Sequence, residues 1–158
     1  MRVLGIDPGT SVTGYGVVET GNGAPGLGRL VECGVIRFAR RTSLPDRLAE
    51  LHDGITDLIK RHRPATLALE DAFYHKNVRT TLVLGQARGV VLLAAAQARL
   101  EIAEYAPATV KKTVVGAGGA GKGQVAAMVA RLLRLTQPPR PADAADGVAV
   151  ALTHIIRT

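Results

Sequence analysis

Near its start the chain reads Arg2-Val3-Leu4-Gly5-Ile6-Asp7-Pro8-Gly9-Thr10, a short apolar run that ends on a carboxylate and a turn. Its length, its β-branched residues and the proline and glycine that follow predict a buried strand over residues 2–7. A second apolar run, residues 66–69, leads in the same way into Glu70. Because the ends of neighbouring strands lie together, the two runs predict an acidic site at one edge of a sheet.

The rest of the chain alternates between strand and helix patterns. Strands are expected over residues 2–7, 13–19, 27–38, 66–69 and 101–105, with Gly21-Asn22-Gly23 as a hairpin turn. Apolar residues at helical spacing predict helices over residues 44–63, 78–100, 124–135 and 142–157, and Pro107 begins a basic turn or helix. This order predicts an α/β fold in one domain, residues 1–158, with a central mixed five-stranded sheet and helices on both faces.

Composition narrows the class of protein. Twenty Lys and Arg against thirteen Asp and Glu give a net charge of +7, which favours an anionic partner such as nucleic acid. The single cysteine, Cys33, excludes an internal disulfide and is expected to be a buried thiol. The longest unbroken apolar run, residues 90–96, is far shorter than the roughly 20 residues of a membrane span. With too short an apolar run at the start for a signal peptide, the chain is expected to be cytoplasmic.

A glycine-rich segment, residues 116–123, matches the first part of a phosphate-binding loop and includes Lys122. The residue after the lysine is Gly123, where such a loop needs a serine or threonine to hold Mg²⁺. Only the short Val114-Val115 precedes the segment, whereas the dinucleotide fingerprint requires a strand there. We therefore expect a loop that carries Lys122 towards a phosphate, with a plain surface loop as the alternative.

Two further acids, Asp143 and Asp146, open the last predicted helix, one turn apart on the same face. With Asp7 and Glu70 they make four carboxylates in a basic chain, and hard cations such as Mg²⁺ take oxygen ligands. The set predicts metal-assisted chemistry on a polyanion. The alternative for Asp143 and Asp146 is that their charges only stabilise the N-terminus of the helix. Asp71 follows Glu70 directly, so in a strand it is expected to point to the opposite face.

Several motifs occur in the order found in a known family. Residues 4–10 alone resemble the first phosphate motif of actin-like ATPases and sugar kinases, but those proteins need two such domains around the nucleotide. The whole set resembles the RuvC family of bacterial Holliday junction resolvases, within the ribonuclease-H-like superfamily. The matching stretches are residues 4–10 with 14–16, 69–73, 84–90, 110–116, 122–125 and 142–146.

The resemblance implies a ribonuclease-H-like fold and a structure-selective endonuclease. Such an enzyme resolves Holliday junctions by paired, symmetric phosphodiester hydrolysis during recombination and repair. Carried over by position, the catalytic and metal-binding acids are Asp7, Glu70, Asp143 and Asp146. The implied cofactor is Mg²⁺, with two ions per site and Mn²⁺ as a substitute. Asp7 is the expected shared ligand, Glu70 and Asp146 would each hold one ion, and Asp143 would ligate or orient water.

The resemblance also implies contacts with DNA. Lys111 and Lys122 correspond to family lysines near the cleavage point, and Lys122 is expected to act in catalysis as well. Phe73 is expected to stack on an unpaired base at the junction centre, worth about 1–3 kcal/mol per base, with core packing as the alternative. Three further expected DNA contacts are Tyr74, Lys76 and Arg79.

The predicted helix over residues 78–100 is apolar around nearly its whole circumference, so both of its sides must be covered. The sheet can cover one side and a second subunit the other. The alternative is a monomer whose own C-terminal helices cover it. The resemblance favours a two-fold homodimer and implies partnership with the RuvA and RuvB branch-migration complex. Two other functions stay open: a related nuclease acting on RNA or other branched substrates, and a non-catalytic junction-binding module.

Overall fold

The structure, a computed structural model, describes residues 1–21, 23, 26–39, 41–71 and 76–158. Within these residues one mixed sheet has the order β3-β2-β1-β4-β5. The β1–β2 and β2–β3 pairs are antiparallel, and the β1–β4 and β4–β5 pairs are parallel. This arrangement confirms the expected mixed five-stranded sheet. The strands are β1 (Arg2–Asp7), β2 (Val12–Glu19), β3 (Arg29–Arg37), β4 (Thr66–Glu70) and β5 (Glu101–Tyr105).

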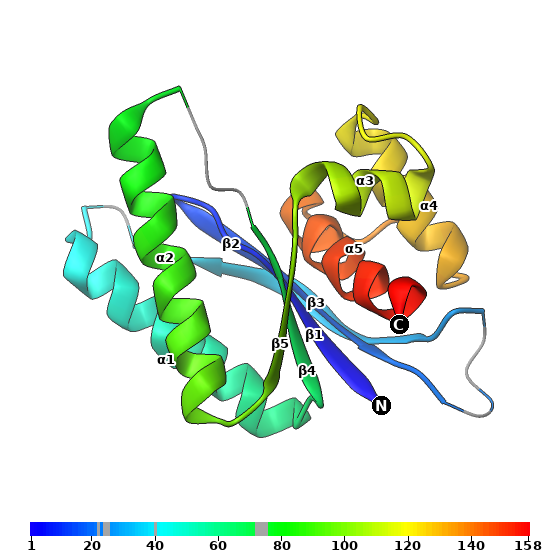
Figure 1. Ribbon diagram of the computed structural model, residues 1–158, viewed down its shortest axis with the longest axis horizontal. Coiled ribbons are helices and arrows are strands. Elements are labelled where there is room, and N and C mark those ends of the chain that lie inside the picture. The colour runs from blue at the N-terminus through cyan, green and yellow to red at the C-terminus, as the bar shows by residue number, and fades with distance from the viewer. Residues whose placement is uncertain (22, 24–25, 40, 72–75) are drawn as a thin grey trace.

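Helices cover both faces of the sheet, as expected (Figure 1). One face carries α1 (Leu44–His62) and α2 (Val78–Gln97), and the other carries α3 (Pro107–Val115), α4 (Lys122–Leu132) and α5 (Ala142–Arg157). The core is accordingly split into two buried apolar clusters, one between the sheet and α1–α2 and one between the sheet and α3–α5.

Strand alternation decides where the strand-end acids point. On β1, Leu4 and Ile6 belong to the α1–α2 cluster, whereas Val3 belongs to the α3–α5 cluster. Successive strand side chains point to opposite faces, so Asp7 at the end of β1 faces α5. The strand β4 alternates in the same way, which turns Glu70 towards the same face.

Helix α5 lies directly on β1 and β2 because glycines remove the side chains that would separate them. A Cβ at Gly14 would overlap the carbonyl oxygen of Asp143, and a Cβ at Gly147 would lie 2.5 Å from the Cα of Tyr15. Gly14 is also the register partner of Asp7 across β1 and β2. The missing side chain at Gly14 therefore brings the first turn of α5 next to the end of β1.

Several predicted helix ends differ from the observed ones. The helix expected to continue to residue 100 ends at Gln97, because Arg99 adopts a left-handed conformation (φ 58) that turns the chain into β5. The helix expected over residues 124–135 begins at Lys122 and ends at Leu132, two residues before the left-handed Arg134 (φ 54). Cys33 is half-buried rather than buried, and its partial burial raises the pKa of the thiol.

A polar cluster joins β2, β3 and the end of α1. The carboxylate of Glu32 accepts hydrogen bonds from the Tyr15 hydroxyl (2.9 Å) and from Nη1 of Arg61 (2.7 Å). The Nε2 of His62 lies 2.7 Å from the same carboxylate. The hydrogen bond from Arg61 is the main reason that the pKa of Glu32 falls to about 2, against the opposing effect of desolvation. The cluster thus fixes α1 to the antiparallel half of the sheet.

We expect Glu32→Gln to lower the free energy of unfolding by about 1–3 kcal/mol, because the groups around it lose an ionised acceptor. A carboxyl group with a lowered folded-state pKa stabilises the fold above its ordinary pKa of 4.5 and loses that contribution as the pH falls through about 2. Urea unfolding from neutral pH to about pH 3 should therefore show a steeper acid loss in wild type than in the variant. Identical pH profiles would contradict this assignment.

Helix α2 is half covered. By length and composition alone it is long and apolar enough to cross a membrane, with 22% of the relevant window buried. Its buried residues, including Ala87 and Val91, pack in the α1–α2 cluster. The opposite side leaves Val78, Leu82 and Leu93 exposed by 73%, 63% and 51%. Because α3, α4 and α5 lie on the other face of the sheet, the C-terminal helices do not cover this side of α2.

Candidate active site

Four carboxylates converge where β1 and β4 end below the start of α5. The parallel register pairs Ile6 with Leu69, so Asp7 and Glu70 follow at adjacent positions. Carboxylate oxygens of Asp7, Asp143 and Asp146 lie within 4.8 Å of one another, and all three residues are half-buried. The structure therefore brings together acids that lie more than a hundred residues apart in the sequence.

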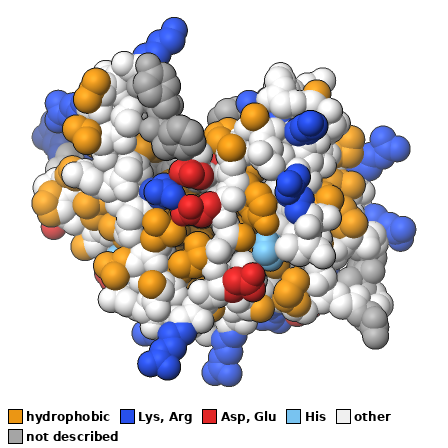
Figure 2. All heavy atoms as spheres, viewed as in Figure 1, with side chains coloured by type: hydrophobic (Ala, Val, Ile, Leu, Met, Phe, Trp, Pro, Cys, Tyr) orange, Lys and Arg blue, Asp and Glu red, His pale blue; other side chains and the backbone are white. Residues whose placement is uncertain are grey.

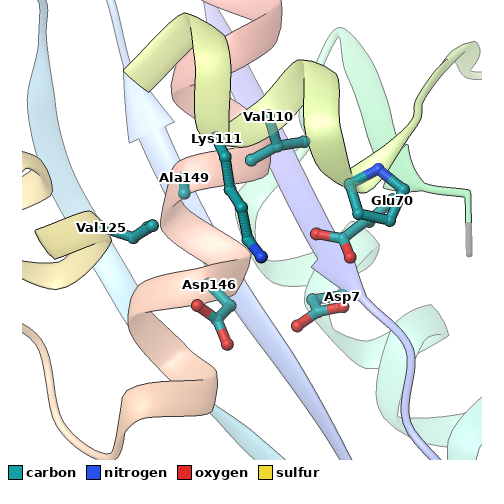
Figure 3. A pocket seen from close by; sticks show the side chains of 8 residues that line it. Asp7, Glu70, Val110, Lys111, Val125, Asp146 and Ala149 are labelled. Atoms are coloured by element: carbon teal, nitrogen blue, oxygen red, sulfur yellow. The ribbon is translucent and has the colours of Figure 1, made fainter. Parts of the chain in front are cut away.

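A cavity of about 230 Å³ opens at this point (Figure 3). Among the described residues, three acids and one lysine provide its charged lining, and the other lining residues are apolar. Glu70 belongs to this lining, whereas Asp143 belongs to the three-carboxylate group; Asp7 and Asp146 are common to both sets. The lining residues are Asp7, Glu70, Pro107, Val110, Lys111, Val125, Asp146 and Ala149.

The donor set fits a divalent cation. Carboxylates this close repel one another when ionised, so a bound cation stabilises the arrangement. Oxygen ligands at about 2.1 Å from an octahedral Mg²⁺ are separated by roughly 3 Å when adjacent and 4.2 Å when opposite. A group whose oxygens already lie within 4.8 Å of one another needs only a small contraction to reach those separations.

Lys111 is the cation of the cavity wall. Figure 3 shows its side chain reaching from α3 towards the space between Asp146 and Asp7, with Glu70 beside Asp7. The preceding residue, Val110, is 3% exposed and packs in the α3–α5 cluster, which fixes this turn of α3 over the site. A positive charge at this point offsets part of the repulsion among the acids and attracts an anionic substrate.

The other expected DNA contacts lie near the starts of α4 and α2 or outside the described residues. Lys122 is the first residue of α4, although its side chain lies outside the described part of the structure. Lys76 precedes α2 and Arg79 lies in its first turn; both are exposed, and neither is among the described residues that line the cavity. Two other expected contacts, Phe73 and Tyr74, lie outside the described residues.

Asp71 faces away from the acidic site, as expected. Its Oδ1 lies 3.0 Å from Nε of Arg88 on α2, and Nη2 of Arg88 lies 2.6 Å from Oε1 of Glu104 on β5. Arg88 was not predicted from the sequence, because an arginine in a predicted helix is normally expected to lie at the surface in contact with solvent. Its place in the Gln86-Ala87-Arg88-Gly89 motif was the only available signal.

The surface around the site suits a polyanion. Figure 2 shows acidic side chains gathered in the hollow between α2 and the layer of α3–α5, and Lys and Arg side chains spread over the surrounding surface. Basic side chains spread over such a surface attract a phosphate backbone.

Comparison with known proteins identifies the family. A family model described as "Crossover junction endodeoxyribonuclease RuvC" matches residues 3–154. A relative of that name from Pelotomaculum thermopropionicum is 49% identical over 154 residues, which cover 98% of this chain and 92% of the relative. The RuvC structure from Thermus thermophilus has a TM-score of 0.87 and 36% identity, covering 99% of this chain and 94% of that chain. A structure of T. thermophilus RuvC in complex with Holliday junction substrate also gives a TM-score of 0.87, at 33% identity and the same coverage. The chain belongs to the RuvC family of crossover junction endodeoxyribonucleases.

Proposed function

We propose that this protein resolves four-way DNA junctions by metal-dependent hydrolysis of phosphodiesters during recombination and repair. The observation that carries the proposal is the convergence of Asp7, Glu70 and Asp146 with Lys111 in one cavity. Family membership supports the substrate class, since the T. thermophilus relative is described in complex with Holliday junction substrate. A flat basic surface without these acids would fit a junction-binding module instead.

The four acids are proposed to hold Mg²⁺, with Mn²⁺ able to replace it and two ions per site. Asp7 is the proposed shared ligand because it ends the central strand β1, beside β4, which carries Glu70. Glu70 would act from the β4 side, and Asp146 from α5. Asp143 joins Asp7 and Asp146 within 4.8 Å, which supports a role as a ligand or in orienting water.

In the reaction, a water oxygen bonds to phosphorus, the bond from phosphorus to the 3′ oxygen breaks, and a 5′-phosphate and a 3′-hydroxyl remain. A metal held by these acids would activate the attacking water and offset charge on the reacting phosphate. Lys111 would donate a hydrogen bond to a phosphate oxygen at the same point. The apolar wall formed by Val110, Val125 and Ala149 excludes water and strengthens these charge interactions.

The proposed DNA contacts come from two parts of the chain. Lys122 begins α4 one turn before Val125, which lines the cavity, and this placement supports a role in both binding and catalysis. The segment between β4 and α2 would supply the remaining contacts. Phe73 would stack on an unpaired base, and further contacts would come from Tyr74, Lys76 and Arg79.

A homodimer is proposed through the exposed side of α2. That side is apolar, and an uncovered apolar helix face fits a contact with a second subunit. A two-fold contact places the same helix of each subunit against its mate and gives two active sites on one junction. Family membership further supports action with the RuvA and RuvB branch-migration complex. It also supports a cytoplasmic location and a single nuclease domain over residues 1–158.

Leu82→Asp should dissociate this dimer, because each subunit would bury an unpaired carboxylate near the axis, at a cost of several kcal/mol. Leu82 is 63% exposed, so folding of the subunit should be unaffected. Sedimentation should show half the wild-type mass, and paired incisions should give way to weak single nicks. The control Ile156→Asp changes an exposed apolar residue on α5 and should leave the mass unchanged. A wild type that sediments as a monomer yet makes paired cuts would overturn the dimer.

The proposed function is tested by incubating the purified protein with a synthetic mobile four-way junction and Mg²⁺ and mapping the cuts. Paired, symmetric incisions that require the metal are expected, with little cutting of three-way or linear duplexes. Preferential cutting of RNA-containing or other branched substrates would favour a related nuclease. Tight junction binding without nicks would favour the binding module.

A further inference from the structure

Arg88 joins three elements beside the acidic site. Its Nε lies 3.0 Å from Oδ1 of Asp71, directly after β4, and its Nη2 lies 2.6 Å from Oε1 of Glu104 on β5. The side chains of Arg88, Asp71 and Glu104 are 31%, 25% and 35% exposed, so all three are partly shielded from water. We call these three residues the Arg88 bridge.

The bridge involves backbone neighbours of Glu70. In the β4–β5 register Leu69 pairs with Glu104 and Glu70 pairs with Tyr105, and the N–H of Asp71 donates to the carbonyl of Tyr105 (2.8 Å). The two bridged acids are therefore the residue that follows Glu70, which is Asp71, and the neighbour of its register partner, which is Glu104. Strand alternation puts them on the α2 side of the sheet, whereas Glu70 points to the α5 side. The bridge is thus outside the cavity but fixes the backbone from which Glu70 projects.

The Asp71 carboxylate depends on Arg88 for its charge partner. The Oδ1 of Asp71 is shielded from solvent and has no hydrogen-bond donor among the described residues, and the Arg88 guanidinium is its charged partner. Without that cation, a shielded carboxylate would stand unpaired next to a metal-binding one, and removing one partner of such a pair is strongly destabilising. The end of β4 would then move to bring Asp71 into water, and Glu70 would move with it.

We propose that Arg88 is a positioning residue that fixes Glu70 for metal binding by holding Asp71 and Glu104, and so joins α2 to the active site. The proposal rests on the proposed function of the acidic site. Arg88 is not among the described residues that line the cavity, and its effect would pass through the end of β4.

The test compares Arg88→Gln, Asp71→Asn and the double variant with wild type. Calorimetry should show that Arg88→Gln weakens Mn²⁺ binding to the free protein, and single-turnover cleavage should slow, each by about 10–100-fold. Junction affinity in EDTA should stay within about threefold, since no phosphate contact is lost. The double variant should be no worse than Arg88→Gln, because both changes remove the same interaction.

Arg61→Gln is the matched control, since Arg61 also pairs with two acids, Glu32 and Asp57, but lies on α1 far from the cavity. It should leave Mn²⁺ affinity and cleavage rate unchanged. If Arg88→Gln does not fold, Asp71→Asn, which removes one of the two contacts of Arg88, must give the same two defects to a smaller extent. Wild-type Mn²⁺ affinity and cleavage rate in Arg88→Gln would overturn the proposal, as would a loss confined to junction affinity. A wild type that binds Mn²⁺ with an affinity that depends on Arg88, but cuts no junction, would contradict the proposed function alone.

Discussion

Asp7→Asn is expected to abolish junction cleavage, with a loss of at least about 10³-fold, while junction binding stays intact or tightens slightly. Asparagine keeps the shape and one oxygen but removes the charge of a carboxylate that belongs to both the cavity lining and the three-acid group. A metal supplies several kcal/mol of transition-state stabilisation, and each 1.4 kcal/mol is about tenfold in rate. Binding should not suffer, because one negative charge near the phosphates is lost. Single-turnover cleavage and gel-shift measurements would separate the two effects.

Asp53→Asn is the matched control, since Asp53 is an exposed acid on α1, across the sheet from the site. The control should cleave at the wild-type rate. Chelation of divalent ions should reproduce the Asp7→Asn result in the unmodified protein. A variant Asp7→Asn that cuts within tenfold of wild type would contradict the assignment of the shared ligand.

Strand patterns predicted the sheet well because each strand carries its own signal. Apolar runs ending on Asp7 and Glu70 predicted that the two acids lie together at one edge of the sheet. The parallel pairing of β1 with β4, and the common face of the two acids, were seen only in the structure. The positions of the four acids already marked them as candidates, since two end apolar runs and two open the last predicted helix. Their separate roles came from the resemblance, because nothing local distinguishes Asp146 from an ordinary acid near a helix start. The convergence of Asp7, Asp143 and Asp146 is a property of the fold, seen only once α5 is placed on β1.

Helix ends were predicted less well for a reason of turn chemistry. Glycine is the usual residue that ends a helix in the left-handed conformation, and its absence removes the signal. Arg99 and Arg134 take that conformation here, so the ends of α2 and α4 were expected three residues too late. Arg88 was missed on similar grounds. Its two acidic partners lie on β5 and directly after β4, and no local pattern in a helix reveals such contacts.

Gly14→Ala should cost both stability and cleavage, because a single methyl group would separate α5 from β2. The new Cβ would overlap the backbone carbonyl of Asp143, which cannot rotate away as a side chain can. Overpacking of this kind typically costs about 1–3 kcal/mol of folding free energy. The first turn of α5 must move away from Asp7, the register partner of Gly14, and a shift of about 1 Å can lower a rate by 10²-fold. Cleavage should therefore fall by about 10²-fold and Mn²⁺ affinity should fall with it.

Gly54→Ala gives the contrast that isolates the backbone clash. A Cβ at Gly54 on α1 would lie 2.9 Å from Cδ1 of Ile36, the end of a flexible side chain that can turn aside. Alanine also favours a helix over glycine by about 1 kcal/mol, which offsets the repacking. This variant should keep wild-type cleavage and lie within about 1 kcal/mol of wild-type stability. Equal losses of cleavage rate in the two variants would mean that the close contact between Gly14 and α5 does not position the acids. A loss of cleavage rate and Mn²⁺ affinity in Gly14→Ala alone would show that metal binding depends on the packing of α5 on β2.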